Sequence, residues 1–181
     1  MTQAANLGAL GTNAGTTGTF PAASLTGVLG YANLPTGSVL QVVQATASSA
    51  STSSTSFVTT GLTASITPKF STSKILVIVS LAEVNVSASN KNATSTIYRN
   101  GSNIAPSGSG IHQAFAAIYA GSSVLTANQN YSYLDSPATT SATTYKIQLA
   151  VDSGTASIAL RIQRIVPPSI RLIQLVRSAS V

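Results

Sequence analysis

The chain of 181 residues contains no cysteine, which excludes disulfide bonds, thiolate metal sites and cysteine nucleophiles. Its longest unbroken aliphatic run, Ile75 to Val79, is far shorter than the roughly 20 residues that a membrane-spanning helix requires. The N-terminus lacks the basic residues and the continuous apolar stretch of a secretory signal. We therefore expect no membrane insertion and synthesis in a cytoplasm. Stability must then come from packing and from subunit association.

Charged side chains are scarce, at 7% of the chain against about 25% in typical soluble domains. The first one is Lys69, and Ser, Thr, Asn, Gln and Gly take the surface positions that charges usually hold. Such a surface protects poorly against association, so the composition indicates a subunit of an assembly. The homo-oligomer that we expect is a trimer.

The net charge of +6 comes from basic residues spread singly between Lys69 and Arg177. Nucleic-acid binding typically uses a run of basic residues or a basic cluster interleaved with aromatic residues, and neither is present. We therefore expect no nucleic-acid partner. A modestly basic face instead suits docking on an acidic protein lattice or on an acidic cell-surface glycan.

Residues 1–37 form an N-terminal arm that is rich in glycine and in small polar residues. The arm has too little apolar surface to fold alone, so we expect neighbouring subunits to order it and the arm to anchor the chain. Because it has no charged side chain, it must attach through backbone hydrogen bonds and apolar contacts. The predicted anchors are Leu7, Leu10, Phe20, Leu25, Val28, Leu29 and Tyr31.

Residues 38–181 are predicted to form one domain built from short strands separated by turn residues. The Asn100-Gly101 pair predicts a type I′ hairpin, because both residues tolerate the positive φ angles of that turn. The fold class that follows is all-β, a jelly-roll-like antiparallel β-sandwich with an extended N-terminal arm. An immunoglobulin-like sandwich remains the alternative. The expected strands are 39–44, 57–60, 62–66, 74–86, 94–99, 102–105, 112–120, 129–135, 143–151, 157–162 and 170–176.

The strand 74–86 is apolar on both faces at its start. One face packs on the opposite sheet of a sandwich, so the other, with Leu76 and Ile78, is free to be a subunit contact. Arg161 and Arg171 are expected to face each other across the last two strands, which is unfavourable without a compensating acid. They are the candidates for intersubunit salt bridges, although two solvated arginines fit the pattern equally well.

Tyr131 and Tyr133 are two residues apart and therefore share a face of their strand. Together with Tyr98 and Tyr119 they are candidates for a receptor-facing patch that binds a sugar or a protein. The alternative, which we favour, is that these rings cap the core or fill a subunit interface.

Candidate catalytic groups are few. There is one histidine, His112, no G-x-S-x-G motif, and only three acids, Glu83, Asp135 and Asp152. A glycan-cleaving enzyme would need two of these acids to converge, and it normally carries aromatic sugar platforms, yet the chain has no tryptophan. The sequence therefore predicts no enzyme, no catalytic or metal-binding residues and no cofactor, with a glycan-cleaving enzyme as a remote alternative.

Four stretches of the chain carry a family resemblance, at residues 34–44, 54–62, 66–70 and 73–80. In these stretches, and in the order of its strands from 34 to 181, the chain resembles small structural proteins of tailed bacteriophages, namely tail-fibre tips and head-decoration proteins. The resemblance implies a trimeric β-sandwich located in the virion, with other virion proteins as partners. Since the chain lacks a repetitive shaft, it implies a short tail-fibre or adhesin subunit that contacts a host glycan or receptor. The alternative is a capsid decoration (cement) protein.

Overall fold

The computed structural model describes residues 34, 35, 37–152, 158–160 and 167–175. The arm, residues 1–37, lies almost entirely outside this range, so its boundary with the sandwich remains a prediction. In the described part the regular secondary structure is almost all β-strand, and the helical element is a single 3-10 turn, η3 (Gly110–His112). No helix among the described residues is long and apolar enough to cross a membrane.

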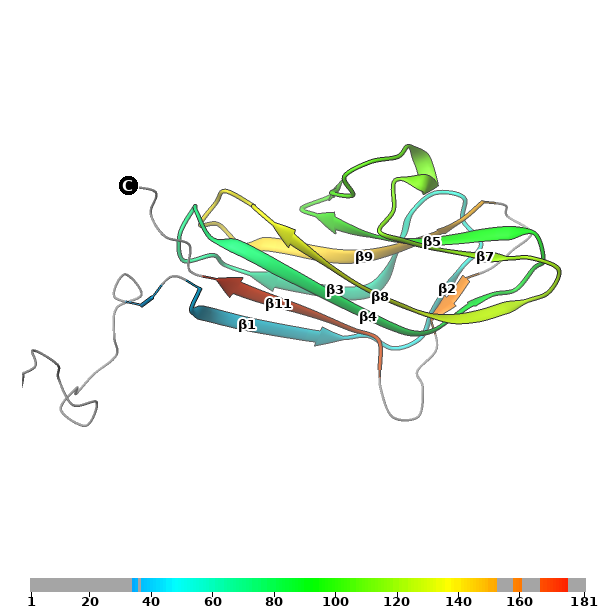
Figure 1. Ribbon diagram of the computed structural model, residues 1–181, viewed down its shortest axis with the longest axis horizontal. Coiled ribbons are helices and arrows are strands. Elements are labelled where there is room, and N and C mark those ends of the chain that lie inside the picture. The colour runs from blue at the N-terminus through cyan, green and yellow to red at the C-terminus, as the bar shows by residue number, and fades with distance from the viewer. Residues whose placement is uncertain (1–33, 36, 153–157, 161–166, 176–181) are drawn as a thin grey trace, which may run out of the picture. The chain divides into compact units, whose positions relative to one another are not determined.

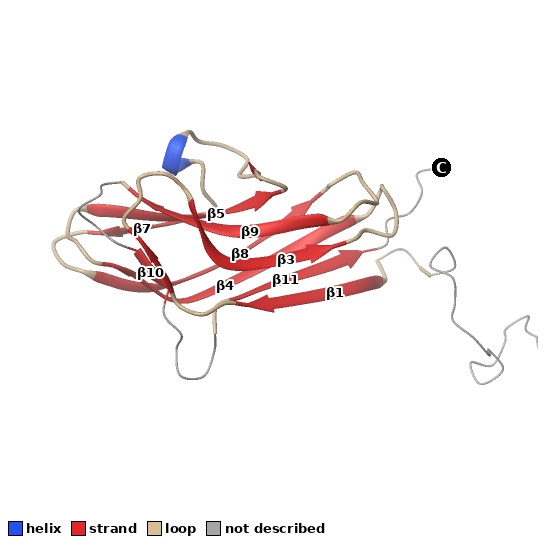
Figure 2. Cartoon of the chain, turned by 180° about the vertical axis from the view of Figure 1, so that it is seen from behind, coloured by secondary structure: helices blue, strands red, loops and turns tan. Residues whose placement is uncertain are grey.

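The strands form two antiparallel sheets that lie face to face (Figures 1 and 2). In sheet A the main order is β1-β11-β4-β8, with β10 and β2 continuing beside the end of β4. In sheet B the order is β3-β9-β5-β7, with the short β6 beside the end of β5. The strands are β1 (Val39–Thr46), β2 (Ala50–Thr52), β3 (Val58–Ile66), β4 (Lys74–Val86), β5 (Lys91–Arg99), β6 (Ser102–Asn103), β7 (Ala116–Ala120), β8 (Leu125–Asp135), β9 (Thr143–Val151), β10 (Ile158–Leu160) and β11 (Ser169–Leu175).

This strand order is that of a jelly roll. If the short strands β2, β6 and β10 are set aside and the other eight are numbered along the chain, sheet A reads 1-8-3-6 and sheet B reads 2-7-4-5. Two interleaved Greek keys produce this order. An immunoglobulin-like sandwich pairs its strands differently. The prediction of an antiparallel all-β sandwich is therefore confirmed, and the topology selects the jelly roll over the alternative.

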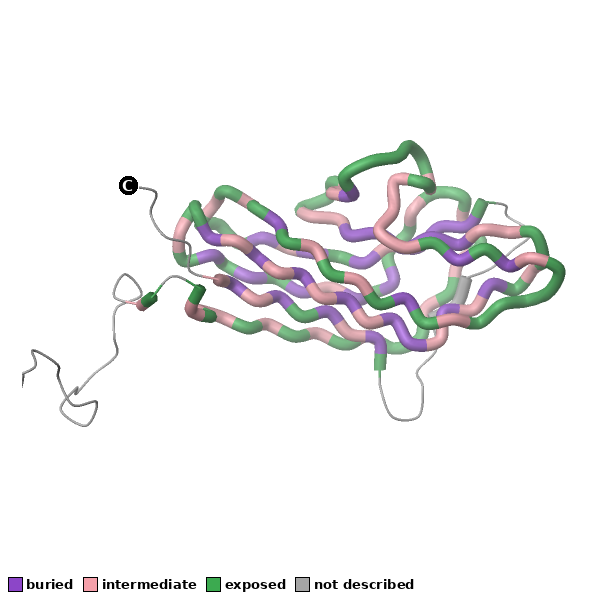
Figure 3. Tube along the Cα trace, in the orientation of Figure 1, coloured by how far each residue is buried: buried purple, intermediate pink, exposed green. Residues whose placement is uncertain are grey.

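The core lies between the sheets, and β4 shows how the sequence builds it. Its first inward-facing residues, from Ile75 to Leu81 at every second position, are buried, and Figure 3 shows the alternation along the strand. Strict alternation would next bury Glu83. A register shift between Leu81 and Val84, with Glu83 at φ 60°, instead turns Val84 inward. This β-bulge keeps the carboxylate out of the core, a feature that alternation alone did not predict.

The Asn100-Gly101 hairpin is confirmed. The two residues have φ angles of 48° and 92°, and Arg99 pairs with Ser102 across the turn.

Other strand boundaries differ from those predicted from the sequence. The predicted strands 57–60 and 62–66 are one strand, β3, with an irregularity at Gly61. Strand β7 begins later than expected because η3 occupies residues 110–112.

Replacing Gly101 with alanine is expected to lower the free energy of unfolding by about 1 kcal/mol, because alanine is strained at positive φ. An added Cβ would meet no atom within 4 Å, so the loss comes from the backbone alone. Gly121→Ala is the matched control, since that site is equally open and its φ is not in the strained range. Urea denaturation of both variants measures the difference, and equal stability of the two would contradict the assignment of the turn.

The expected pairing of the last two strands is wrong. Strands β10 and β11 both pair with β4, along different parts of it, and they do not pair with each other in the described residues. Arg171 has Gln44 and Ile78 as its register partners, so it does not face Arg161 across a strand pair. Arg161 itself lies outside the described residues.

Candidate interaction surfaces

The outer face of sheet A carries a continuous apolar row across four strands. The register places Val42 of β1 beside Ile173 of β11, then Leu76 of β4, then Leu134 of β8. Val42 and Leu134, at the two ends, are 57% and 51% exposed. Leu76 and Ile173 are half-buried by their neighbours. Exposed apolar residues that join into one patch, unlike isolated ones, indicate an interaction site.

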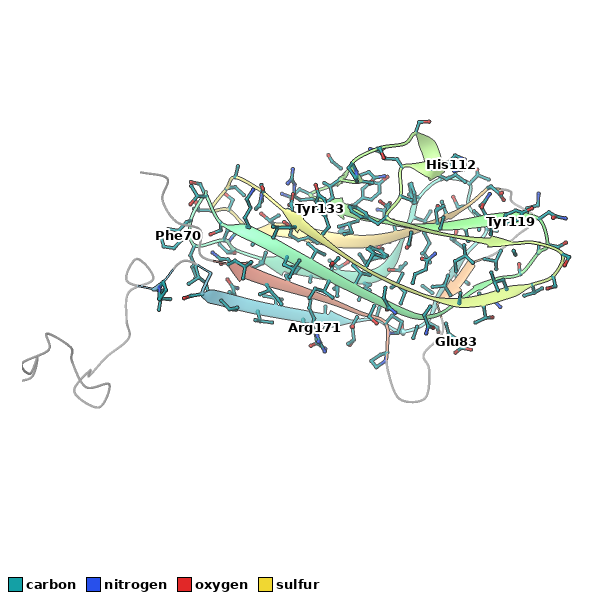
Figure 4. The ribbon with its side chains drawn as sticks, viewed as in Figure 1. Phe70, Glu83, His112, Tyr119, Tyr133 and Arg171 are labelled. Atoms are coloured by element: carbon teal, nitrogen blue, oxygen red, sulfur yellow. The ribbon has the colours of Figure 1, made fainter. Side chains whose placement is uncertain are left out.

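A second row lies directly beside the apolar row and consists of Gln44, Arg171, Ile78 and Ser132. We call these eight residues the sheet A face. Arg171 projects from the sheet (Figure 4), and its Nε donates to Gln44 Oε1 at 3.0 Å. The face contains no acid, so the guanidinium has no counter-ion within it.

The sheet A face continues into a shallow depression of about 370 Å³ between β4 and β8. Ile78 and Ser132 line it, together with Ser80 and Asn130, whose side chains are joined by a hydrogen bond of 2.8 Å. The structure thus brings together two predicted interface residues, Leu76 and Ile78, with Arg171. It adds the flanking residues on β1, β8 and β11, which could be found only once the register was known.

The four tyrosines do not form one patch. Tyr131 and Tyr133 do share a face, as expected, but that face points inward, where they pair in register with Val79 and Val77. Phe115 stacks on Tyr131 at 5.7 Å between ring centroids and meets Tyr133 edge-on at 5.0 Å. These three rings lie where the edge strands β7 and β8 meet, so they close one side of the sandwich.

The hydroxyl of Tyr131 is buried, and burial raises the pKa of Tyr131 above its usual value, while the neighbouring Ser95 hydroxyl lowers it to a smaller degree. The Ser95 hydroxyl donates its hydrogen bond to Gln129 Oε1 instead, at 2.5 Å. No well-aligned partner for the Tyr131 hydroxyl is found within the described part of the chain. A buried, uncharged phenol of this kind supports the core and is not available to a receptor.

Tyr98 and Tyr119 lie on the outer face of sheet B, separated along β5 and β7. Tyr119, labelled in Figure 4, is 56% exposed. Its hydroxyl donates to Asn90 Oδ1 at 3.1 Å. Tyr98 is half-buried and meets the Phe57 ring edge-on, with 6.1 Å between centroids. Of the four tyrosines, these two lie on an outer face, whereas Tyr131 and Tyr133 are partly buried against the core.

Asp135 is a structural acid. It is 5% exposed and accepts hydrogen bonds from Arg99 and from the Tyr145 hydroxyl. It pairs in register with Ile75 at the start of β4, whereas Glu83 lies eight residues further along that strand, about 25 Å away. Asp152, at the end of β9, accepts hydrogen bonds from Asn92. A glycosidase requires two neighbouring carboxylates, and Asp135 therefore lacks the second one.

His112 lies in η3 and is exposed (Figure 4). Within the residues that the structure describes, no three metal-ligating side chains cluster. The predicted anchors Leu7, Leu10, Phe20, Leu25, Val28, Leu29 and Tyr31 all lie outside those residues.

No protein-family model matches the chain, and no curated protein matches it by sequence. Among solved structures it is similar to VP2 in a subviral particle of infectious bursal disease virus, with 14% identity and a TM-score of 0.41. That match covers 76% of this chain and 37% of the other. For the Gt strain of the same virus the identity is 14% and the TM-score 0.39, covering 86% and 43%. The chain thus spans less than half the length of these proteins.

Proposed function

We propose that this chain is a non-enzymatic structural subunit of a virion that assembles as a homotrimer through the sheet A face. The observation that carries the assembly is the apolar row Val42, Ile173, Leu76 and Leu134, which crosses four strands on the outside of the sandwich. The resemblance of the four sequence stretches between residues 34 and 80 to phage structural proteins supports the virion as its location. A partner that covers this row removes apolar surface from water, which stabilises the complex by about 25 cal/mol for each Å² buried. A second copy of the chain is the partner.

Charge supports a second copy as the occupant. Arg171 needs an acid across the interface, because the sheet A face has none. Asp135 is already paired with Arg99, but Glu83 and Asp152 form no ion pair within the described residues, so a neighbouring copy can supply either one. The chain has 7% charged residues, so copies packed side by side bring few like charges together.

The mass of the assembled protein tests this proposal. Light scattering on the purified full chain at micromolar concentration should give three times the 18.3 kDa of one chain. A stable, folded monomer under those conditions would overturn the proposal. A dimer of the same face would keep the interface and refute the trimer.

Within the virion, the more specific role that we propose is a short tail-fibre or adhesin subunit anchored by the arm. A capsid decoration protein, with the arm laid over the shell, is the second candidate. Micrographs of particles labelled with an antibody against this chain separate the two, because the label would lie at the tail tip in the first case and over the head in the second.

The arm is expected to attach the protein to the particle, while the sandwich folds and assembles without it. A chain that begins at Thr36 retains every described strand, since β1 starts at Val39. It should fold and form the same oligomer but fail to join particles. Efficient incorporation of this shortened chain, measured by quantitative blotting of purified particles, would show that the sandwich itself does the docking.

Attachment by the arm should also resist salt, because no charged side chain precedes Lys69. At roughly molar ionic strength the screening length falls to about 3 Å, which weakens exposed ion pairs and leaves apolar contacts intact. Phe20→Asp or Leu29→Asp should release the protein by placing a charge in an apolar contact. Steady loss of the unmodified protein with rising salt would instead assign the attachment to the basic sandwich.

A further inference from the structure

A second depression, of about 270 Å³, lies on the sheet B side of the molecule and belongs to neither the core nor the sheet A face. Tyr98 of β5 and Phe57, just before β3, contribute its aromatic surface. The loop residues Thr55 and Ser56 line it beside Phe57, and Ile111 of η3 and Gln113 line it from the β6–β7 loop. Two loops that are distant in sequence therefore meet over one accessible aromatic pair.

The loop before β3 is held in shape by its own hydrogen bonds. Ser54 Oγ donates to the Ser56 carbonyl at 2.7 Å and accepts from the Ser56 amide at 3.1 Å. The side-chain hydroxyls of Thr55 and Ser56 are not used in these bonds. This side of the depression is thus preformed, and its hydroxyls are available to a ligand.

The opposite loop is fixed in the same way, through two amide side chains. Asn103 Oδ1 accepts from Thr96 Oγ1 at 2.8 Å and from the Ala105 amide at 3.0 Å, and its Nδ2 donates to the Gln113 carbonyl at 2.7 Å. Gln113 Nε2 donates to the Ala105 carbonyl at 3.3 Å. A binding site whose walls are ordered before the ligand arrives loses less entropy on binding.

Gly108 explains how the loop closes so tightly. Its φ is +101°, and an added Cβ would lie 2.3 Å from the His112 carbonyl oxygen. The turn before η3 can therefore form only with glycine at this position. This close approach brings Gly110 and Ile111 to the rim of the depression.

The chemistry of the lining selects the ligand. It contains aromatic rings, hydroxyls and amides but no acid, lysine or arginine. Sugar rings match this combination, because one side of a pyranose presents C–H groups to an aromatic ring while its hydroxyls exchange hydrogen bonds with polar groups. Lys146, the register neighbour of Tyr98, is exposed beside the depression and does not line it. The ligand is therefore expected to be neutral.

We propose that this depression binds a neutral sugar residue of an oligosaccharide. The inference names a ligand class for the adhesin role proposed above, whereas assembly requires only the sheet A face, and it replaces the four-tyrosine patch with a site built on Tyr98 and Phe57. Because the depression and the assembly face lie on different sheets, sugar binding and oligomer mass are measured independently. A negative result for sugar binding would therefore not contradict the proposed assembly, and a monomeric mass would not contradict sugar binding.

The test is saturation-transfer NMR on the full chain. The probes are millimolar neutral oligosaccharides containing glucose, galactose, mannose or N-acetylglucosamine, together with one sialylated oligosaccharide. At least one neutral probe should give transfer signals, and Tyr98→Ala and Phe57→Ala should each weaken its binding at least tenfold. Tyr119→Ala is the matched control, because it removes an exposed tyrosine on the same outer face away from the depression, and it should bind as the unmodified protein does.

Ser56→Trp keeps the test decisive if the aromatic truncations disturb folding. It fills the depression from an exposed position without removing a core contact, so it should abolish binding while the thermal unfolding curve stays unchanged. The proposal is overturned if no neutral probe binds, if only the sialylated probe binds, or if binding survives both Tyr98→Ala and Ser56→Trp. Binding of a peptide at this site with no response to any sugar would overturn it as well.

Discussion

Replacing Asp135 with alanine is expected to lower the free energy of unfolding by about 3–5 kcal/mol, the cost of removing one partner of a buried ion pair. Asp135 is 5% exposed and accepts hydrogen bonds from Arg99 Nη1 at 2.7 and 2.9 Å and from the Tyr145 hydroxyl at 2.7 Å. The acid lies in sheet A, on β8, and its donors lie in sheet B, on β5 and β9. Its loss would leave a guanidinium and a buried phenol without their shared acceptor.

The lower end of that range is the better expectation, because the Arg99 side chain is 32% exposed and water can solvate it after the change. In a domain of this size each kcal/mol shifts the melting temperature by roughly 2–4 °C, so the melting temperature of the variant should be about 10 °C lower than that of the unmodified protein. Urea denaturation supplies the free energy directly. A loss below about 1 kcal/mol would mean that the sheets do not depend on this bridge.

Asp152→Ala is the matched control. Asp152 is also an acid on sheet B's side of the molecule, but it is exposed, and its hydrogen-bond donors among the described residues are the Asn92 backbone and side-chain amides. Its removal should cost no more than an ordinary exposed hydrogen bond, about 1 kcal/mol or less. Tyr145→Phe should fall between the two, since Asp135 would keep Arg99 as a partner.

The parts of the fold that follow from local chemistry could be predicted. The Asn100-Gly101 turn is specified by two residues that accept positive φ, and β4 and β9 by apolar residues at every second position. The bulge at Glu83 could not be found in this way, because it depends on which face of β4 meets the other sheet. A charged residue at the next expected core position was the available signal.

Strand order and surface sites depend on contacts that are distant in sequence. Arg171 was expected beside Arg161, but β11 inserts between β1 and β4, so its neighbours are Gln44 and Ile78. The same non-local pairing turned Tyr131 toward the core and set Tyr98 beside Phe57. Leu76 and Ile78 were identified from the sequence as the outward face of β4, and the register extended that pair into the sheet A face. Whether this face joins subunits is the remaining prediction.

Ile78→Asp is expected to convert the assembled protein into a folded monomer. Ile78 is half-buried in the sheet A face, between Arg171 and Ser132 in register, and its side chain points away from the core. In a single chain the new carboxylate would stay hydrated and lie beside the Arg171 guanidinium, so the sandwich should keep its fold. In the assembly the same carboxylate would lose its water against an apolar neighbour, at a cost of several kcal/mol.

Light scattering and circular dichroism together separate these outcomes. The variant should show the mass of one chain with an unchanged β-sheet spectrum, and Leu76→Asp should behave alike because it lies in the adjacent apolar row. Ser65→Asp adds the same charge to the outer face of sheet B and should leave the oligomer intact. If Ile78→Asp and Leu76→Asp both keep the unmodified mass, then the sheet A face is not the subunit interface. If Ser65→Asp also dissociates the protein, general charge repulsion and not the burial of this face explains the effect, because only a local interface distinguishes the two sides of the sandwich.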